Sequence, residues 1–418
     1  MQRRTDADTC PAKVLLMGYN GANNTGSEAR LLAIIEDVRA VLGHSTLITV
    51  PTLNEANLRR YIQEGSTLQI APFPSIFFFA LRKFVREHDL LLLVEGSCYM
   101  DTWTSALLWA FLWTTRCAYM RNKPCLAYAV DAGDLSPFNK CCVRREASKT
   151  TLIITRTQSA AERLKSWGVT APIEITTDTA FTFHPDPADS DLLRRVWPES
   201  APGVVGLAVV NFYLWPVVMR LWGRREHCYK WPYYFSQSPQ RRQAAEVLAS
   251  GLAAEADRIV EKYNKSIALI CMEEVDEPLA QNVSHRMTHS DRAQVFSSRQ
   301  YNASQMTTLL RELDLLVTSR YHAGVLSLAA QIPQVAVGHD KRLEDFYREL
   351  GLKEEFFIAY NSPQVFECLQ DRIDRLLRNP IPVKEVLRKG YEGYMTKALR
   401  NRKLLRDFVA ESGWQVMA

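Results

Sequence analysis

The sequence lacks the signatures of several common protein classes. Its nine cysteines show no C-x-x-C spacing, so we expect reduced thiols rather than disulfides or zinc ligands. No apolar run is long enough to span a bilayer unbroken, and residues 1–13 lack the apolar core of a secretory signal. A formal net charge of +5 gives no reason to expect a nucleic-acid partner. These absences predict a cytoplasmic protein.

Two common ligand-binding motifs are missing as well. The turn from Gly18 to Gly26 has neither the G-x-G-x-x-G spacing of dinucleotide sites nor a Walker lysine. His285 and His289 are spaced for one helical face, but no glutamate completes an H-E-x-x-H motif. We therefore predict no metal site and no cofactor.

The length and the pattern of the chain predict two domains. A chain of 418 residues exceeds the usual size of one hydrophobic core. Strand-like apolar runs alternate with amphipathic helices, which is typical of Rossmann-like parallel sheets. A proline-rich segment near 183–202 separates two such series. We predict domains at 1–185 and 203–378, and a helical segment at 379–418 that crosses back to the first domain.

Three apolar stretches remain to be explained. The stretches at 74–81 and 104–114 are too short to cross a membrane, and the one at 204–221 is interrupted by polar residues and proline. We expect most of this surface to be buried in strands and helices. Aromatic residues continue to position 235, and they either join the core or meet a sugar face or lipid-linked substrate at a membrane surface.

A glycine- and asparagine-rich turn follows the first predicted strand, Val14–Met17. Glycines such as Gly21, with Asn24 nearby, let the backbone turn tightly and point N–H groups at an anion before a helix begins. The alternative is a purely structural turn.

Charged residues also follow other predicted strands of the first half. Glu95 either acts as a base or caps its turn, and Arg156 either recognises a carboxylate or phosphate or forms a surface pair. Asp178 closes a later strand, where a structural role is the simpler interpretation. Because ligands in α/β sheets gather at the carboxyl ends of strands, all three are candidates for one site.

The most informative segment is in the second half. A predicted strand ends at Thr318 and is followed by Ser319, Arg320 and His322. Lys341 follows the next strand, and neighbouring parallel strands end side by side. An arginine, a lysine and an imidazole at one sheet edge predict an anion site with a proton donor.

In this order, these pieces resemble the polysaccharide pyruvyl transferase family. The matching segments are Gly18 to Glu28, Glu95 to Asp101, Thr155 to Leu164 with Asp178, and Thr318 to Lys341. The resemblance implies a glycosyltransferase-B-like α/β architecture, with two Rossmann-like domains facing across a cleft. It also implies phosphoenolpyruvate as donor and a saccharide acceptor, either a polysaccharide or its lipid-linked precursor.

The resemblance implies a role for each of the candidate residues. His322 would be the general acid, and Glu95 or Asp178 the base. The donor would be bound by Arg320, Lys341, Arg156, Gly21, Asn24 and Ser319. The acceptor would meet Trp215, Trp231 and Tyr234. Two other functions remain open, a sugar-nucleotide-dependent glycosyltransferase of the same architecture and a non-catalytic scaffold of a polysaccharide assembly complex.

Overall fold

The chain forms two compact units in the computed structural model, which describes residues 11–102, 104–200, 202–214, 217–225, 228–231, 233–236, 238–338 and 340–417. Unit 1 contains the chain up to Ala22, Ser27–Phe183 and the chain from Tyr394. Unit 2 contains Asn23–Gly26 and His184–Gly393. The long C-terminal helix α15 (Ile381–Glu411) therefore contributes to both.

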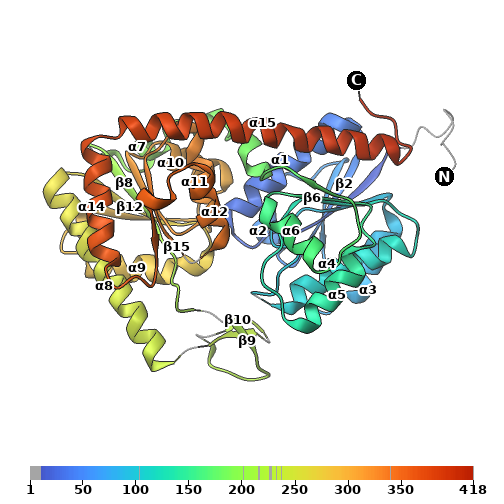
Figure 1. Ribbon diagram of the computed structural model, residues 1–418, viewed down its shortest axis with the longest axis horizontal. Coiled ribbons are helices and arrows are strands. Elements are labelled where there is room, and N and C mark those ends of the chain that lie inside the picture. Colours follow the sequence, from blue (N-terminus) through green and yellow to red (C-terminus); the bar gives the residue numbers. More distant parts are fainter. Residues whose placement is uncertain are drawn as a thin grey trace. The chain divides into compact units, whose positions relative to one another are not determined.

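Unit 1 is built around a parallel sheet with strand order β3-β2-β1-β4-β5-β6-β7 (Figure 1). The strands are β1 (Lys13–Met17), β2 (Leu47–Thr52), β3 (Leu68–Pro72), β4 (Leu90–Leu93), β5 (Cys125–Val130), β6 (Leu152–Thr155) and β7 (Ile173–Ile175). The helices are α1 (Thr25–Leu42), α2 (Glu55–Leu58), α3 (Phe78–Glu87), α4 (Ser105–Tyr119), α5 (Pro137–Ala147) and α6 (Gln158–Ser166).

Both faces of this sheet are covered, which explains why its strands are apolar throughout. In β1, Leu15 and Met17 pack with residues of α3 to α6, whereas Val14 and Leu16 pack with α1 and the end of α15. Successive side chains of a strand point to opposite faces, so an uninterrupted run such as that of β4 fits burial on both sides.

Unit 2 contains a second parallel sheet, with strand order β13-β12-β8-β14-β15-β16. The strands are β8 (Val204–Ala208), β12 (Ser266–Cys271), β13 (Ala293–Ser297), β14 (Leu315–Thr318), β15 (Gln334–Gly338) and β16 (Phe357–Ala359). The helices are α7 (Leu192–Val196), α8 (Pro239–Tyr263), α9 (Glu277–Arg286), α10 (Ala303–Arg311), α11 (Tyr321–Ser327), α12 (Lys341–Glu349), α13 (Lys353–Phe356) and α14 (Val365–Arg378).

The two sheets share one topology, and this confirms the predicted pair of Rossmann-like α/β domains. In each sheet the order reverses beside the strand that comes first in the chain, between β1 and β4 in unit 1 and between β8 and β14 in unit 2. Such a reversal leaves a crevice at the carboxyl ends of the strands, where ligands of open α/β sheets bind. The loops after these four strands are therefore the places to look for a site.

Other elements differ from the sequence-based expectation. The strands β2 and β3 and the helix α3 were not predicted, and the aromatic region contains a small antiparallel sheet of order β10-β11-β9. Its strands are β9 (Val217–Met219), β10 (Cys228–Lys230) and β11 (Tyr233–Phe235). Among the described residues, no helix combines the length and the apolar composition needed to cross a bilayer.

Candidate active site

The glycine- and asparagine-rich turn after β1 divides between the two units. Its first part belongs to unit 1, where Gly21 has a φ of +77° and a Cβ on it would lie 2.5 Å from the carbonyl oxygen of Asn54. Both facts require glycine at this position. The Gly21 carbonyl accepts a hydrogen bond of 3.1 Å from the Asn57 side chain. These contacts give Gly21 a structural role, and donor binding there stays a prediction.

The second part of the turn, Asn23–Gly26, belongs to unit 2 and lies at the carboxyl end of β12. The Thr25 N–H donates to the Met272 carbonyl at 2.9 Å, and Asn24 forms an antiparallel bridge with Glu273. The Ser298 hydroxyl donates to the Asn23 carbonyl at 2.6 Å. The structure thus brings Asn24 to the same sheet edge as the predicted donor residues of unit 2.

Gly26 lies directly against the imidazole of His322. A Cβ on Gly26 would lie 2.0 Å from His322 Nδ1, a distance at which one of the two groups must move. His322 is half-buried in the first turn of α11, immediately after β14. The glycine therefore makes room for the imidazole at the switch point of the second sheet, which is where the sequence predicted a proton donor.

Arg320 is held by two buried carboxylates. Its Nε donates to Asp276 Oδ2 at 2.9 Å, its Nη2 donates to Asp276 Oδ1, and its Nη1 donates to Glu273 Oε2 at 3.1 Å. The Arg320 side chain is 17% exposed, against 5% for Glu273 and 1% for Asp276. A guanidinium has five N–H donors, and two of them have no partner among the described residues, so they can meet a ligand.

The electrostatics of this cluster follow from its burial. Burial raises the pKa of Glu273 and of Asp276 above their ordinary values, and the Arg320 guanidinium opposes that rise. Burial alone would lower the pKa of Arg320, but the two carboxylates outweigh it and raise that pKa. The arginine is thus charged and fixed in orientation, although one cation faces two acidic groups.

Ser319 and Lys341 complete the predicted donor set of unit 2. Ser319 is 3% exposed, and within the described part of the chain its hydroxyl has no hydrogen-bonding partner. Lys341 begins α12, is 47% exposed, and its Nζ lies 3.4 Å from Glu344 Oε2 and 3.3 Å from Asp345 Oδ1. Donor binding by both residues stays a prediction.

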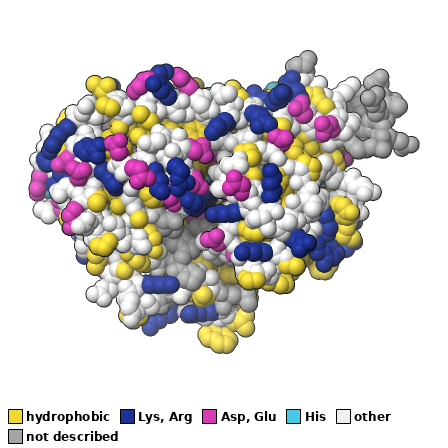
Figure 2. Space-filling model, in the orientation of Figure 1, with side chains coloured by type: hydrophobic (Ala, Val, Ile, Leu, Met, Phe, Trp, Pro, Cys, Tyr) yellow, Lys and Arg dark blue, Asp and Glu magenta, His cyan; other side chains and the backbone are white. Residues whose placement is uncertain are grey.

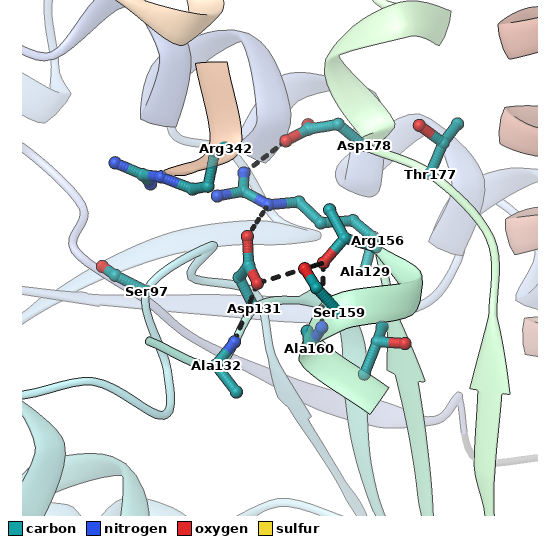
Figure 3. A network of polar contacts seen from close by, with 12 residues as sticks. Ser97, Ala129, Asp131, Ala132, Arg156, Ser159, Ala160, Thr177, Asp178 and Arg342 are labelled. Carbon is teal, nitrogen blue, oxygen red and sulfur yellow. Dashed lines mark hydrogen bonds and ion pairs between the residues drawn. The ribbon is translucent and has the colours of Figure 1, made fainter. Parts of the chain in front are cut away.

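Arg156 lies in a separate, fully buried ion-pair network of unit 1 (Figure 3). Its Nε donates to Asp131 Oδ2 at 3.0 Å, and its Nη1 donates to Asp178 Oδ2. The Arg156 side chain has no exposed surface. This packing requires a glycine at position 96, because a Cβ there would lie 2.7 Å from Arg156 Nη1. Its burial excludes a pair at the surface, and donor binding by Arg156 stays a prediction.

A second arginine completes this network. Arg30 of α1 lies 2.8 Å from Asp178 Oδ1, and its Nη2 donates to the Ala129 carbonyl at 2.8 Å. Ala129 has a φ of +52° at a register shift in β5, a conformation that costs a non-glycine residue energy. The strained residue thus directs its carbonyl at a buried cation.

The two candidate bases have different surroundings. Glu95 is 9% exposed and accepts hydrogen bonds from the backbone N–H of Tyr19 and from the N–H and hydroxyl of Ser97. Asp178 has no exposed surface and also accepts from the Ala180 N–H. The contacts of Glu95 are those of a capping carboxylate. The base roles of both residues stay predictions, and the burial of Asp178 favours the structural interpretation.

Two of the predicted acceptor residues, Trp231 and Tyr234, lie in or next to the small antiparallel sheet. Trp231 is 61% exposed, and its Nε1 donates to the Leu221 carbonyl at 3.4 Å. Tyr234 is only 6% exposed and packs beneath Gly223, so its ring does not offer a face to a sugar. Trp215 lies outside the described residues. The acceptor role of Trp231 is therefore the one that its exposure favours.

Sequence reasoning did not identify several residues of these clusters. Glu273 and Asp276 follow β12, and the strand-end rule that selected Arg320 could have selected them. Arg30 stands within an apolar helix segment, where a buried charge requires a partner. Asp131 follows β5, so the same strand-end rule could have selected it.

Several solved structures are similar to this chain over nearly its whole length. HepE from Anabaena in complex with UDP-glucose has a TM-score of 0.60 at 11% identity, covering 96% of this chain and 99% of that one. UDP-GlcNAc 2-epimerase from Neisseria meningitidis bound to UDP-GlcNAc has a TM-score of 0.57 at 10% identity, covering 96% of this chain and 100% of that one. A glycosyltransferase from Rickettsia africae has a TM-score of 0.52 at 10% identity, covering 96% of this chain and 98% of that one. At such identities the likeness shows a glycosyltransferase-B-like fold alone.

Sequence comparison is more specific. No curated protein sequence matches this chain. The sequence profile of one family, polysaccharide pyruvyl transferase, matches residues 24–341. The match begins at Asn24 and ends at Lys341, so it contains the Arg320 and His322 segment and the whole Arg156 network. The chain therefore belongs to the polysaccharide pyruvyl transferase family.

Proposed function

We propose that this protein transfers the enolpyruvyl group of phosphoenolpyruvate to a saccharide and forms a pyruvate ketal. Family membership supports a pyruvyl transfer to a polysaccharide. The observation that carries the residue assignment is the contact of Gly26 with the imidazole of His322 beside a clamped Arg320. An ionisable ring and an arginine at the switch point of a sheet suit an anionic donor.

The reaction requires one proton delivered to carbon and one leaving phosphate. His322 donates a proton to the methylene carbon C3, while a sugar hydroxyl adds to C2 and loses its proton to a base. The bond between C2 and the phosphate oxygen then breaks, and a second hydroxyl of the same sugar closes the ketal while its proton passes to the departing phosphate. The products are the pyruvylated sugar and inorganic phosphate, and no redox cofactor is needed.

The remaining residues would hold the donor. Arg320 would use its two remaining N–H groups on the carboxylate or phosphate, and Lys341 would add a second positive charge. Asn24 and Ser319 would donate hydrogen bonds from the same sheet edge. The ion pairs already fix the Arg320 side chain before the donor binds. They would therefore reduce the conformational entropy that this side chain loses on binding.

Incubation of the protein with phosphoenolpyruvate and candidate oligosaccharides tests this proposal. We expect release of inorganic phosphate together with an oligosaccharide whose mass has increased by one pyruvate ketal. Phosphate release without the adduct, or no phosphate release with any acceptor, would argue against pyruvyl transfer.

A glycosyltransferase that uses a sugar nucleotide is the second candidate. It is favoured by solved structures of the same fold that contain UDP-glucose or UDP-GlcNAc. Thermal-shift measurements with phosphoenolpyruvate and with UDP-glucose separate the two, because a ligand that binds the folded state raises the melting temperature. A shift with UDP-glucose alone would favour the second candidate.

A further inference from the structure

Unit 1 exposes large apolar side chains of the kind that a protein normally buries. Three of them lie at the start of α3 and just before it: Ile76 is 75% exposed, Phe78 41% and Phe79 82%. Trp109 of α4 is 40% exposed, and Phe138 of α5 is 67% exposed. Most of the surface of the segments at 74–81 and 104–114 was expected to be buried, and Ile76, Phe79 and Trp109 are exceptions to that expectation. Grouped exposed apolar residues mark a surface that meets a partner.

These side chains and Trp113 lie on or just before helices that pack side by side, α3 with α4 and α4 with α5, and we call them the aromatic patch: Ile76, Phe78, Phe79, Trp109, Trp113 and Phe138. The ring of Phe78 lies 5.6 Å from that of Trp113, and the ring of Trp109 lies 6.5 Å from that of Phe138. Trp109 and Trp113 are one helical turn apart on α4. Their indole N–H groups donate to Asn139 Oδ1 at 2.9 Å and to the Phe78 carbonyl at 2.8 Å. The rings are thereby fixed in position.

Basic residues surround the aromatic patch. The exposed face of α3 carries side chains spaced three, four and seven positions apart, namely Phe79, Arg82, Lys83 and Arg86. The exposed residues of α5 include Lys140 and Arg144. Figure 2 shows yellow and dark blue side chains close together over the part of unit 1 where these helices lie. An aromatic surface edged by cations is typical of proteins that rest on a membrane.

These three helices carry an excess of positive charge. Together α3, α4 and α5 contain seven Lys and Arg residues and two Glu residues, a net charge of +5. The whole chain of 418 residues also has a net charge of +5. Within the described part of the chain, Arg82, Lys83, Lys140 and Arg144 form no ion pair. Their charges are available to an anionic partner.

From the exposed rings and the surrounding cations, we infer that the aromatic patch binds the surface of a bilayer containing anionic phospholipids. Phe79 and Ile76 would enter the interface between headgroups and acyl chains, and the cations would meet phosphate groups. A second copy of the chain is a poorer occupant, because symmetric pairing would bring two surfaces of net charge +5 together. The inference concerns unit 1 alone and does not depend on the proposed reaction.

Vesicle co-sedimentation with the full chain tests this inference. Vesicles of phosphatidylcholine alone are compared with vesicles that also contain phosphatidylglycerol. We expect clear binding to the anionic vesicles only, and a loss on the order of tenfold or more for the double variant Ile76→Ser, Phe79→Ser. The double variant Lys83→Glu, Lys140→Glu should lose the preference for anionic vesicles. Because these four side chains are exposed, the variants should retain the wild-type melting temperature.

Matched controls remove exposed apolar side chains elsewhere. Val247→Ser and Ile381→Ser, at positions 61% and 74% exposed in unit 2, should bind vesicles like wild type. Wild-type protein that fails to bind anionic vesicles would overturn the inference. So would an Ile76→Ser, Phe79→Ser variant that binds as wild type does, or one whose only change is its oligomeric mass by light scattering.

Discussion

Unit 1 buries its arginine and carboxylate cluster completely, whereas unit 2 leaves its cluster partly open beside an imidazole. In unit 1, two arginines face two aspartates, and Arg156 and Asp178 have no exposed surface. In unit 2, one arginine faces two acids and is itself 17% exposed. The first arrangement balances its charges without a ligand.

The difference indicates that the chain uses arginine–carboxylate ion pairs for two purposes, one structural and one for the proposed binding of a ligand. A buried and balanced ion-pair network fixes loops at a sheet edge, because each member is costly to leave unpaired. A cluster with spare N–H donors beside His322 can accept an anion and move a proton. The predictions test whether this division is correct, beginning with the largest expected effect.

The first prediction concerns His322. His322→Ala removes the proposed acid and should lower turnover by roughly a hundredfold to ten-thousandfold, while phosphoenolpyruvate affinity stays near that of wild type. Single-turnover rates and calorimetric donor binding measure the two quantities. His289→Ala is the control, because that exposed histidine of unit 2 pairs with Glu261 at the surface. Near-normal turnover in His322→Ala would show that His322 is not the acid.

The second prediction tests the structural role of the unit 1 network. Asp178→Ala leaves Arg30 and Arg156 with one buried carboxylate between them, and should destabilise the protein by roughly 3–5 kcal/mol. The melting temperature and urea midpoint measure the loss. Glu174→Ala is the control in the same unit, because its pair with Arg400 is exposed and should contribute about 1 kcal/mol or less. Equal losses in both variants would contradict the proposed contrast.

The third prediction uses the contact between Gly26 and the imidazole. Gly26→Ala places a methyl group where His322 Nδ1 now lies, so the ring must move and turnover should fall about a hundredfold. No catalytic group is removed. Gly65→Ala is the control, because a Cβ there meets nothing within 4 Å. If Gly26→Ala has wild-type turnover, the position of His322 next to Gly26 has no importance for the reaction.

The fourth prediction concerns Arg320. Arg320→Ala should weaken donor binding by roughly 1.5–3 kcal/mol and also lower turnover, and Arg320→Lys should restore little because it lacks the planar fork. Without the guanidinium, burial raises the pKa of Glu273 and Asp276 further. An acid whose folded-state pKa is raised adds stability at low pH, and that stability is lost as the pH rises through the raised pKa. The melting temperature of the variant should therefore lie further below that of wild type near pH 7 than near about pH 5. Wild-type donor affinity in Arg320→Ala would exclude the donor role.

The smallest expected effect concerns the acceptor. Trp231→Ala should raise the acceptor KM by a few-fold, on the order of 1 kcal/mol, and leave the donor KM unchanged, because an exposed ring can stack on a sugar face. Leu399→Ala, at a position 53% exposed in unit 1, is the control. An unchanged acceptor KM would leave the small antiparallel sheet without an acceptor role.

The sequence predicted the repeating architecture because its signals are local. Strands such as β14 and β15 and the helix α10 begin and end at the residues that apolar runs and breakers indicated. The short strands β2 and β3 were missed, since β2 contains a proline and β3 alternates weakly. The helix α3 was hidden within an apolar segment whose exposure the sequence does not indicate.

The sequence alone determined which residues follow the strand ends, and so placed Arg320 and His322 at one edge of a sheet. Only the tertiary structure decided their partners: Arg320 meets Glu273 and Asp276, 47 and 44 positions earlier. It also assigned Asn23–Gly26 to unit 2, and Gly26 to the side of His322. The physical reason is that strand and turn preferences act between neighbouring residues, whereas ion pairs and steric contacts depend on which strands become adjacent in the folded sheet.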